Sequence, residues 1–375
     1  MERIGIICEY NPFHNGHIYH IEKIKEMFPK SSIVLVLSGN FTERGEISIL
    51  DKWDKTMIAL NHGVDLVVEL PLPYSIESAD TFSSGAIRIL SYLNCTKLVF
   101  GVETDDINMF YNLANIQIDN PGYNSIVKEY MDLGYNYPTS MSKALEDLSE
   151  CTINTANDLL ALSYVKEIIK QESCMEPVCI KRSDDYYKSA SLIRESLNTF
   201  QSISQYVPED TYELLRNYDP TYMNRYFNYL KFRIITEIDE LDKYMDVEEG
   251  IESRIKKSIL KSNNYDELIE NVKTKRYTKS RLNRMFIHIL LNYKKEDSKI
   301  LKNIDYIRVL GFTKNGTKII KEVRLEGLIP LITNYSDISS PTMDFILRST
   351  FIYNQIMNHD DNIKELKSVP IIYTK

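Results

Sequence analysis

The sequence lacks any apolar run that approaches the roughly 20 residues needed to cross a bilayer. It also lacks a charged segment followed by an apolar core at its beginning, so we expect no signal peptide. Low-complexity tracts and evident repeats are missing too. These absences exclude membrane-spanning and repeat proteins, and we expect a globular protein with no membrane partner.

Cysteine is scarce, and no two of the five cysteines form a CxxC pair. They are Cys8, Cys95, Cys151, Cys174 and Cys179. Most lie in apolar stretches, which favours reduced structural thiols and fits a cytoplasmic protein. The pattern predicts no metal ligands from the protein.

An excess of positive charge is also missing, because 45 lysines and arginines face 53 acids, a net charge of −8. This excludes a protein that is basic all over, although a local basic patch can still bind nucleic acid. The length of 375 residues allows two domains, or one large domain with an appendage.

The most informative stretch lies at the beginning of the chain. The apolar run Arg3–Cys8 predicts a strand, and the loop EYNPF leads from it to His14-Asn15-Gly16-His17 at the start of an amphipathic helix. A helix start offers unpaired backbone N–H groups and the positive end of the dipole, which favour an anion. Side chains three apart share a helix face, so His14 and His17 can reach the same phosphate chain. The alternative is two histidines on a solvated helix surface.

Further strand-like runs alternate with helical patterns up to about residue 200. We expect strands at 32–37, 65–70, 97–102 and 178–181, with helices over 51–63, 75–93 and 154–170 and more helices over 105–150. The alternation predicts an α/β fold with a Rossmann-like parallel sheet. Loops 9–17, 39–44 and 101–103 then meet at the carboxyl edge of the sheet, where such folds bind ligands. At the start of the 154–170 helix, Asn157 and Asp158 are also ordinary capping residues.

The pattern changes beyond about residue 200. Helical, tyrosine-rich segments over 212–244 and 247–260 replace the alternation, so we predict an α/β domain at 1–204 and a mainly α-helical domain at 205–375. Near the end, Asn315-Gly316 is typical of a turn, and the last residues can add a short strand. One run in this half has six cations and no acid: Lys273, Lys275, Arg276, Lys279, Arg281 and Arg284. Such a run is either a solvated helix face or a surface that contacts nucleic-acid phosphates.

HNGH resembles the HxGH signature of nucleotidylyltransferases and class I aminoacyl-tRNA synthetases. The longer run GIICEYNPFHNGH resembles the bacterial tRNA(Met) cytidine acetate ligase family, and so do blocks along the whole chain: SGNFTERGEIS, VELPLPYSIESADTFSSGAI, NTANDLLALSY, KRYTKSRLNRMFIHILL and YIRVLGF. Glu43 stands where the family has Gln, Ala156 where it has Pro, and Asp158 where it has Asn. Ser189-Ala190-Ser191-Leu192-Ile193-Arg194 resembles the SSTxIR motif, whose serines and arginine hold the β- and γ-phosphates.

The resemblance implies the site. His14, His17 and Arg194 are the expected catalytic residues. ATP contacts are implied for Ile7, Cys8, Glu9, Tyr10, Asn11, Pro12, Phe13, His14, Asn15, Gly16, His17, Ile18, Tyr19, His20, Gly101, Asn157 and Arg182. The implied reaction activates acetate with ATP, with Mg²⁺ expected, and acetylates N4 of the wobble cytidine of elongator tRNA(Met). The resemblance thus makes 1–204 the ATP-binding catalytic domain and 205–375 the tRNA-binding domain, with the six cations of the 273–284 run as expected tRNA contacts.

Two alternatives remain open from the sequence. One is a small-molecule nucleotidylyltransferase, against which the basic, helical second half argues. The other is a non-catalytic RNA-binding protein on the same scaffold, against which the intact His14, His17 and Arg194 argue. Pyrophosphate release with acetate but without tRNA would separate the ligase from both.

Overall fold

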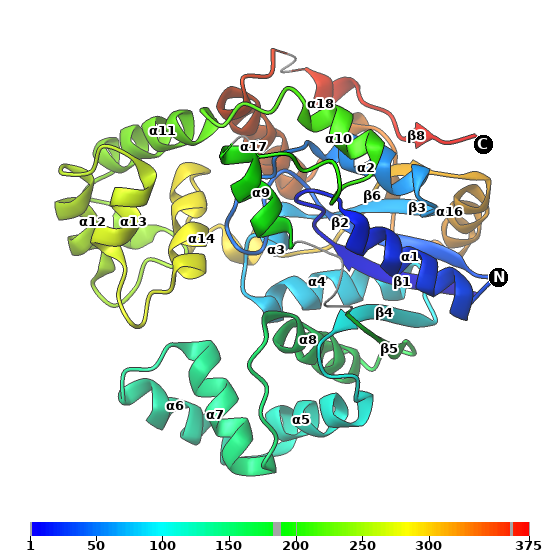
Figure 1. Cartoon of the computed structure of the whole chain (residues 1–375), viewed down its shortest axis with the longest axis horizontal. Coiled ribbons are helices and arrows are strands. Elements are labelled where there is room, and N and C mark those ends of the chain that lie inside the picture. The colour runs from blue at the N-terminus through cyan, green and yellow to red at the C-terminus, as the bar shows by residue number, and fades with distance from the viewer. Residues whose placement is uncertain (1, 183–188, 200, 361–362, 375) are drawn as a thin grey trace.

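A computed structural model describes residues 2–182, 189–199, 201–360 and 363–374. The described residues form a central sheet in the order β5-β4-β1-β2-β3-β6-β7, with β8 paired to β6 (Figure 1). The strands are β1 (Arg3–Cys8), β2 (Ser32–Ser38), β3 (Leu66–Leu70), β4 (Lys97–Val102), β5 (Glu176–Lys181), β6 (Ile307–Phe312), β7 (Leu331–Ile332) and β8 (Ile371–Ile372).

The first five strands are all parallel, and β1 lies between β2 and β4. The chain reverses its direction of growth across the sheet at β1, so the carboxyl ends of β1 and β4 flank the position where α/β folds bind ligands. The connecting helices are α1 (Asn15–Met27), α2 (Lys52–Asn61), α3 (Leu72–Ser75), α4 (Ala79–Tyr92) and α8 (Ala156–Lys170). The predicted Rossmann-like parallel sheet is confirmed for these five strands, within a sheet that is mixed as a whole.

The middle strand β2 shows why the sheet is buried on both faces. All seven of its residues are buried. Leu35 and Leu37 belong to one apolar cluster, whereas Val34 and Val36 belong to the other. Successive side chains of a strand point to opposite faces, so an unbroken apolar run fills a core on each side.

Three helices follow β4 and project from the sheet (Figure 1, lower part). They are α5 (Ile107–Asp119), α6 (Tyr123–Asp132) and α7 (Tyr137–Ser149). Helix α5 packs on α8, and α6 packs on α7. Helices were expected here, and the prediction is confirmed.

A second group of helices lies beyond residue 189. It comprises α9 (Ala190–Asn198), α10 (Glu209–Leu215), α11 (Tyr222–Thr236), η1 (Leu241–Lys243), α12 (Ile251–Ile259), α13 (Tyr265–Val272), α14 (Lys279–Leu290) and α15 (Ser298–Leu301). The chain then returns to the sheet through β6, which pairs antiparallel with β3. The remaining helices are α16 (Lys314–Glu326), η2 (Tyr335–Asp337), α17 (Pro341–Met357) and α18 (Lys364–Lys367).

This return joins the end of the chain to the sheet, and one apolar cluster contains residues from both sides of position 204. The division into domains at 204/205 stays a prediction. The expected turn at Asn315-Gly316 is wrong, because both residues lie in the first turn of α16, where the Thr313 hydroxyl accepts from their N–H groups. Gly316 serves close packing instead, since a Cβ there would lie 2.2 Å from the Asp65 carbonyl oxygen. Within the described residues, every helix is too short or too polar to cross a bilayer.

Candidate active site

Two stacked histidines lie just beyond the carboxyl end of β1. His14 is the N-cap of α1, and its Nδ1 accepts a hydrogen bond from the Gly16 N–H at 3.0 Å. His17 Nδ1 accepts from the His14 N–H at 3.1 Å, so the two side chains form a reciprocal capping box. Their ring centroids are 3.8 Å apart and their planes are 27° apart.

The capping box fixes the protonation of both rings. A ring nitrogen that accepts from a backbone N–H carries no proton, so each neutral imidazole holds its proton on Nε2. Burial and the nearby Arg182 lower the pKa of His14 to about 4. Burial also holds the pKa of His17 well below its usual range, with contributions from His14, His20 and Arg182. Near pH 7 the pair therefore offers two neutral Nε2–H donors, which suit phosphate oxygens.

The backbone of α1 is less available than the sequence predicts. The Asn15 N–H donates to the Tyr206 carbonyl at 2.9 Å, and the His17 N–H donates to the His14 carbonyl at 2.8 Å. The Gly16 N–H is bound by His14 Nδ1. The expectation of unpaired N–H groups at this helix start is wrong, because the capping box and the 205–206 segment occupy them. These N–H groups are thus not free to bind an anion, whereas the histidine Nε2–H groups remain as donors.

The remaining residues of the expected ATP run divide into two groups. Tyr10, Asn11, Pro12 and Phe13 are buried, and the rings of Tyr10 and Phe13 pack against His17. The Tyr10 ring packs edge-on against His17, with 4.7 Å between centroids. The partly exposed group comprises Ile7, Cys8, Glu9, Asn15, Gly16, Ile18, Tyr19 and His20.

Three more expected ATP residues meet at the end of β4. Arg182 Nε lies 3.4 Å from Glu103 Oε1, which also accepts from Asn157 Nδ2 at 2.7 Å. A Cβ on Gly101 would lie 3.3 Å from Arg182 Cγ, so the glycine lets the arginine side chain cross the strand end. The structure thus gathers Gly101, Asn157 and Arg182 around Glu103. The sequence predicted that Glu103 lies at this edge of the sheet but did not identify it as a site residue.

Asp158 has a different role from helix capping. Its carboxylate accepts from the N–H groups of Glu103 and Thr104, at 2.9 and 3.3 Å, and from the Thr104 hydroxyl. The cap of α8 is Thr155, whose hydroxyl oxygen accepts from the Asp158 N–H at 3.1 Å. Asp158 therefore fixes the loop after β4, so the capping interpretation of this residue is wrong.

Arg194 reaches the same region from α9. Its NH1 donates to the Asn11 carbonyl at 2.6 Å, and its NH2 contacts Glu46 Oε2 at 2.5 Å and Ser191 Oγ at 3.4 Å. The Ser189 hydroxyl caps α9. The arginine is thus directed at the loop that precedes His14, and its assignment to the leaving phosphates stays a prediction.

Lys55 and Glu9 organise the neighbouring strand ends. The ammonium of Lys55, which is fully buried, donates to the carbonyls of Glu9, Ser38 and Gly39 at 3.0, 2.9 and 2.6 Å. Glu9 Oε1 accepts from the Glu43 N–H at 2.6 Å. Burial and the neighbouring Glu43 raise the pKa of Glu9 to about 7. Sequence analysis missed Lys55, because a lysine in an amphipathic helix usually faces water.

The basic run, residues 273–284, contains three arginines and three lysines, and the two kinds of side chain differ in their contacts. Arg284 contacts Glu43 at 3.1 Å, Arg281 contacts Glu248 at 3.2 Å and stacks on Tyr277, and Arg276 lies 3.5 Å from Glu249. The lysines of the run are exposed and have no ion pair within the described part of the chain: Lys273, Lys275 and Lys279. The pairing of the arginines fits the alternative of a solvated, ion-paired helix, while the lysines stay available for phosphate.

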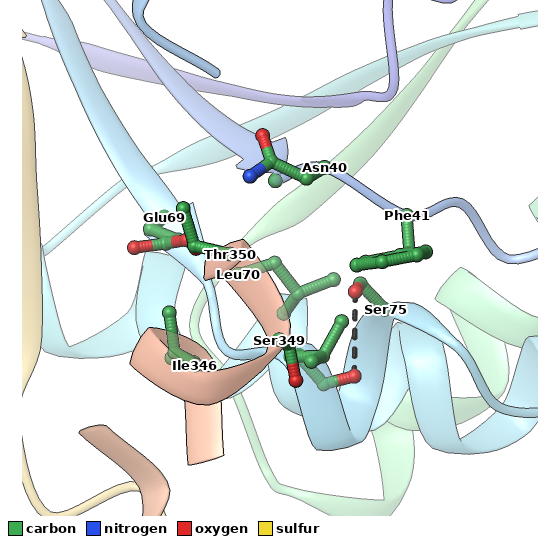
Figure 2. Close-up of a pocket in the computed structure, with 10 residues that line it drawn as sticks. Asn40, Phe41, Glu69, Leu70, Ser75, Ile346, Ser349 and Thr350 are labelled. Atoms are coloured by element: carbon green, nitrogen blue, oxygen red, sulfur yellow. Dashed lines mark hydrogen bonds between the residues drawn. The ribbon is translucent and has the colours of Figure 1, made fainter. Parts of the chain in front are cut away.

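A cavity lies between the ends of β2 and β3 and helix α17, lined in part by Asn40, Phe41, Glu69 and Ser349 (Figure 2). Its volume is about 10 Å³, which holds one water molecule and not a nucleotide. Glu69 belongs to a buried ionic cluster, because Lys52 Nζ lies 2.7 Å from Glu69 and 2.6 Å from Glu365. Arg308 contacts the same Glu365. Through Glu365, this ionic cluster joins α18 to the sheet beside the cavity.

Comparison with known proteins agrees with this arrangement. The model of the HIGH Nucleotidyl Transferase family matches residues 1–368. The tRNA(Met) cytidine acetate ligase of Anoxybacillus flavithermus is 39% identical over 358 residues, covering 89% of each chain. That of Clostridium acetobutylicum is 36% identical over 385 residues and covers 95% of this chain and 96% of its own.

Solved structures extend the similarity to the whole fold. Thermotoga maritima TmcAL bound with alpha-thio ATP superposes with a TM-score of 0.89 at 27% identity, and all of both chains is covered. The apo form of that protein gives a TM-score of 0.91. With identities above one third along most of its length and a matching fold throughout, the chain belongs to the tRNA(Met) cytidine acetate ligase family of HIGH nucleotidyl transferases.

Proposed function

We propose that the protein activates acetate with ATP and transfers the acetyl group to N4 of the wobble cytidine of elongator tRNA(Met), which forms N4-acetylcytidine. One observation carries the proposal: a chain of this ligase family keeps both histidines as neutral Nε2–H donors at the carboxyl end of β1. The Thermotoga maritima relative binds an ATP analogue, which supports ATP as the nucleotide substrate here.

In the first step, an acetate oxygen attacks the α-phosphate, the bond to the β-phosphate breaks, and acetyl-adenylate and pyrophosphate form. Acetate is already ionised at pH 7, so the step needs no general base. The protein positions the two anions and stabilises the charge that develops on phosphate oxygens. His14 and His17 supply Nε2–H donors for that purpose, and Arg182 adds fixed positive charge beside them.

Arg194 is proposed to hold the phosphates that leave as pyrophosphate. Its present partners include the Glu46 carboxylate, so it exchanges a carboxylate for phosphate oxygens when ATP binds. A carboxylate is planar and a phosphate is tetrahedral, and a guanidinium binds the oxygens of either group through paired N–H groups.

Mg²⁺ belongs to the proposal in a limited way. Among the described residues, no three His, Cys, Asp or Glu side chains are grouped as metal ligands. Both oxygens of Asp158 are occupied by the loop after β4. A magnesium ion would therefore be held by the phosphates and water, as is usual for this ion, and would neutralise phosphate charge when bound.

In the second step, the exocyclic amine of cytidine attacks the acetyl carbon, the bond to AMP breaks, and the amine loses a proton. The base must leave any stacked helix to reach the mixed anhydride, which an unpaired anticodon loop allows. The three exposed lysines of the basic run are available to contact the tRNA backbone.

The test is nucleoside analysis by mass spectrometry. Unmodified elongator tRNA(Met) is incubated with the protein, ATP and acetate, and N4-acetylcytidine is expected at the wobble position only when both small substrates are present. Pyrophosphate release that requires acetate but not tRNA would exclude the RNA-binding alternative. Failure of acetate to stimulate pyrophosphate release would overturn the proposal.

A further inference from the structure

Large apolar side chains are exposed at the turn between α6 and α7. Leu133 is 74% exposed, Tyr135 is 41% exposed and Tyr137 is 49% exposed. The three lie within five positions of one short connection. Exposed large apolar side chains gathered at one turn make this a candidate surface for a partner.

Tyr135 is held in place on this surface. Its ring centroid lies 5.1 Å from Lys143 Nζ and 6.0 Å from the centroid of Tyr130, in an edge-on arrangement. Tyr130 is itself fixed, because its hydroxyl donates to Asp147 at 2.8 Å. A ring that is already ordered loses little conformational entropy when a flat partner stacks on it.

The basic run reaches the same turn from the other helical group. Arg276 NH2 donates to the carbonyl oxygen of Met131, at the end of α6, over 3.4 Å. Three lysines close to Arg276 in sequence are exposed and have no ion pair within the described ranges: Lys273, Lys275 and Lys279. An aromatic surface and a cationic surface from distant parts of the chain therefore adjoin at Arg276.

Both surfaces are also attached to the edge of the ATP site. On one side, Ser142 of α7 donates to Asn154 at 2.8 Å, and the adjacent Thr155 donates to Glu103. On the other side, Arg284 of α14 binds Glu43, whose N–H donates to Glu9. Each helical group is thus linked to the site; Figure 1 shows α5–α7 below the sheet and α11–α14 to its left.

The charges of the two surfaces indicate which chemistry each binds. Helices α6 and α7 carry four acids and two lysines, so they do not attract phosphate; these residues are Glu129, Asp132, Glu146, Asp147, Lys128 and Lys143. The basic run has six cations and no acid. A partner with negative charge on one side and flat apolar rings on the other is single-stranded nucleic acid, in which aromatic side chains stack on bases and cations contact phosphates.

We propose that the α6–α7 turn, with Tyr135 as its stacking residue, and the basic run together form a binding surface for an unpaired RNA loop. The inference rests on the proposed function, in which the acetyl acceptor is a tRNA base, and it assigns the base-stacking part of that contact to the first helical group. The basic run supplies the phosphate contacts.

The test is the affinity of the full-length protein for a fluorescently labelled anticodon stem-loop of elongator tRNA(Met). Tyr135→Ala is expected to weaken binding by about 5- to 160-fold, the loss that follows removal of one stacking contact. Tyr135→Phe keeps a ring and is expected to bind as the unaltered protein does. Phe232→Ala removes a 69% exposed aromatic side chain on α11 and serves as the matched control, with no expected change.

Two further measurements separate this inference from the proposed function. Acetate-dependent pyrophosphate release is expected to stay unchanged in Tyr135→Ala, because the turn does not contact the histidines. Pairing the loop with a complementary oligonucleotide is expected to remove most binding. Equal affinity of Tyr135→Ala and the unaltered protein, or an equal loss in Phe232→Ala, would overturn the inference while acetate activation stands. Absent acetate activation in the unaltered protein would instead overturn the proposed function.

Discussion

Arg284 on α14 binds Glu43 twice, through the backbone carbonyl at 3.2 Å and the carboxylate at 3.1 Å. The contact is tight, because a Cβ on Gly45 would lie 2.2 Å from the Arg284 backbone nitrogen. Glu43 in turn donates its N–H to Glu9 at the end of β1. The helical group that carries the basic run is therefore fixed to the candidate active site through one loop.

This link predicts a difference between two substitutions. Arg284→Met leaves the largely buried Glu43 carboxylate without its cation and is expected to lower the free energy of unfolding by about 1–3 kcal/mol. Glu43→Gln restores the residue typical of the family and still offers an oxygen to Arg284, so a smaller loss is expected. Urea denaturation of both variants measures this order, and a larger loss in Glu43→Gln would contradict it.

The histidine capping box gives a second prediction. His14→Asn keeps a good N-cap but removes the Nε2–H donor, whereas His14→Ala removes both. Acetate-dependent ATP–pyrophosphate exchange is expected to fall by about 10²- to 10³-fold in either variant, the loss typical of one transition-state donor. Only the alanine variant is expected to lose stability, by about 1 kcal/mol.

His17→Ala is expected to lose exchange activity to the same extent, because its Nε2–H lies beside that of His14. Near-normal exchange in His14→Asn would remove His14 from the chemistry and leave it only a structural role. Thermal unfolding of each variant, measured alongside exchange, separates the two contributions.

The lowered pKa of His14 makes stability depend on pH in one direction. The unfolded chain binds a proton at this residue below about pH 6.5, whereas the folded chain does so only below about pH 4. The free energy of unfolding therefore decreases as pH falls from about 6.5 through 4, and His14 accounts for about 3 kcal/mol of that decrease. His14→Asn is expected to flatten that part of the profile, and an unchanged slope would show that His14 is not buried and neutral. His17 adds to the slope in the same sense.

Local apolar patterns in the sequence predicted the sheet and the residues that gather at its carboxyl edge. The strand Arg3–Cys8, the helix that follows it and the strand Lys97–Val102 lie where their apolar patterns predict, because each pattern is read over a few consecutive residues. The same holds for the gathering of Gly101, Asn157 and Arg182 at one edge, which follows from the parallel topology.

Contacts between distant residues could not be read in this way. Glu43 with Arg284, Lys55 with three strand-end carbonyls, and β6 with β3 all depend on how separate elements pack. Side-chain rotamers could not be predicted either. The sequence HNGH predicts two histidines at a helix start, but not that their Nδ1 atoms accept hydrogen bonds from the backbone N–H groups there. The side-chain donors, rather than the backbone, thus became visible only in the folded chain.

The pairing of the basic run leads to the last prediction. The arginines have carboxylate partners, so reversing their charge would disturb stability as well as any RNA contact. Lys273→Glu, Lys275→Glu and Lys279→Glu together avoid that problem, because these side chains are exposed and have no ion pair within the described residues. The triple variant is expected to weaken tRNA binding and to flatten its dependence on salt, by about one unit of slope for each phosphate that a lysine no longer neutralises.

Activation of acetate is expected to be unchanged in this variant, since the lysines do not belong to the candidate active site formed by His14, His17, Arg182 and Arg194. A matched control reverses three exposed lysines of α16: Lys314→Glu, Lys318→Glu and Lys321→Glu. Both triple variants change the net charge equally, so a general electrostatic effect would weaken tRNA binding in both. A loss confined to the 273–279 variant, with a reduced salt slope and normal pyrophosphate release, would place phosphate contacts on this run. Unchanged affinity in that variant would place the RNA backbone elsewhere, and the run would then be an ordinary solvated segment.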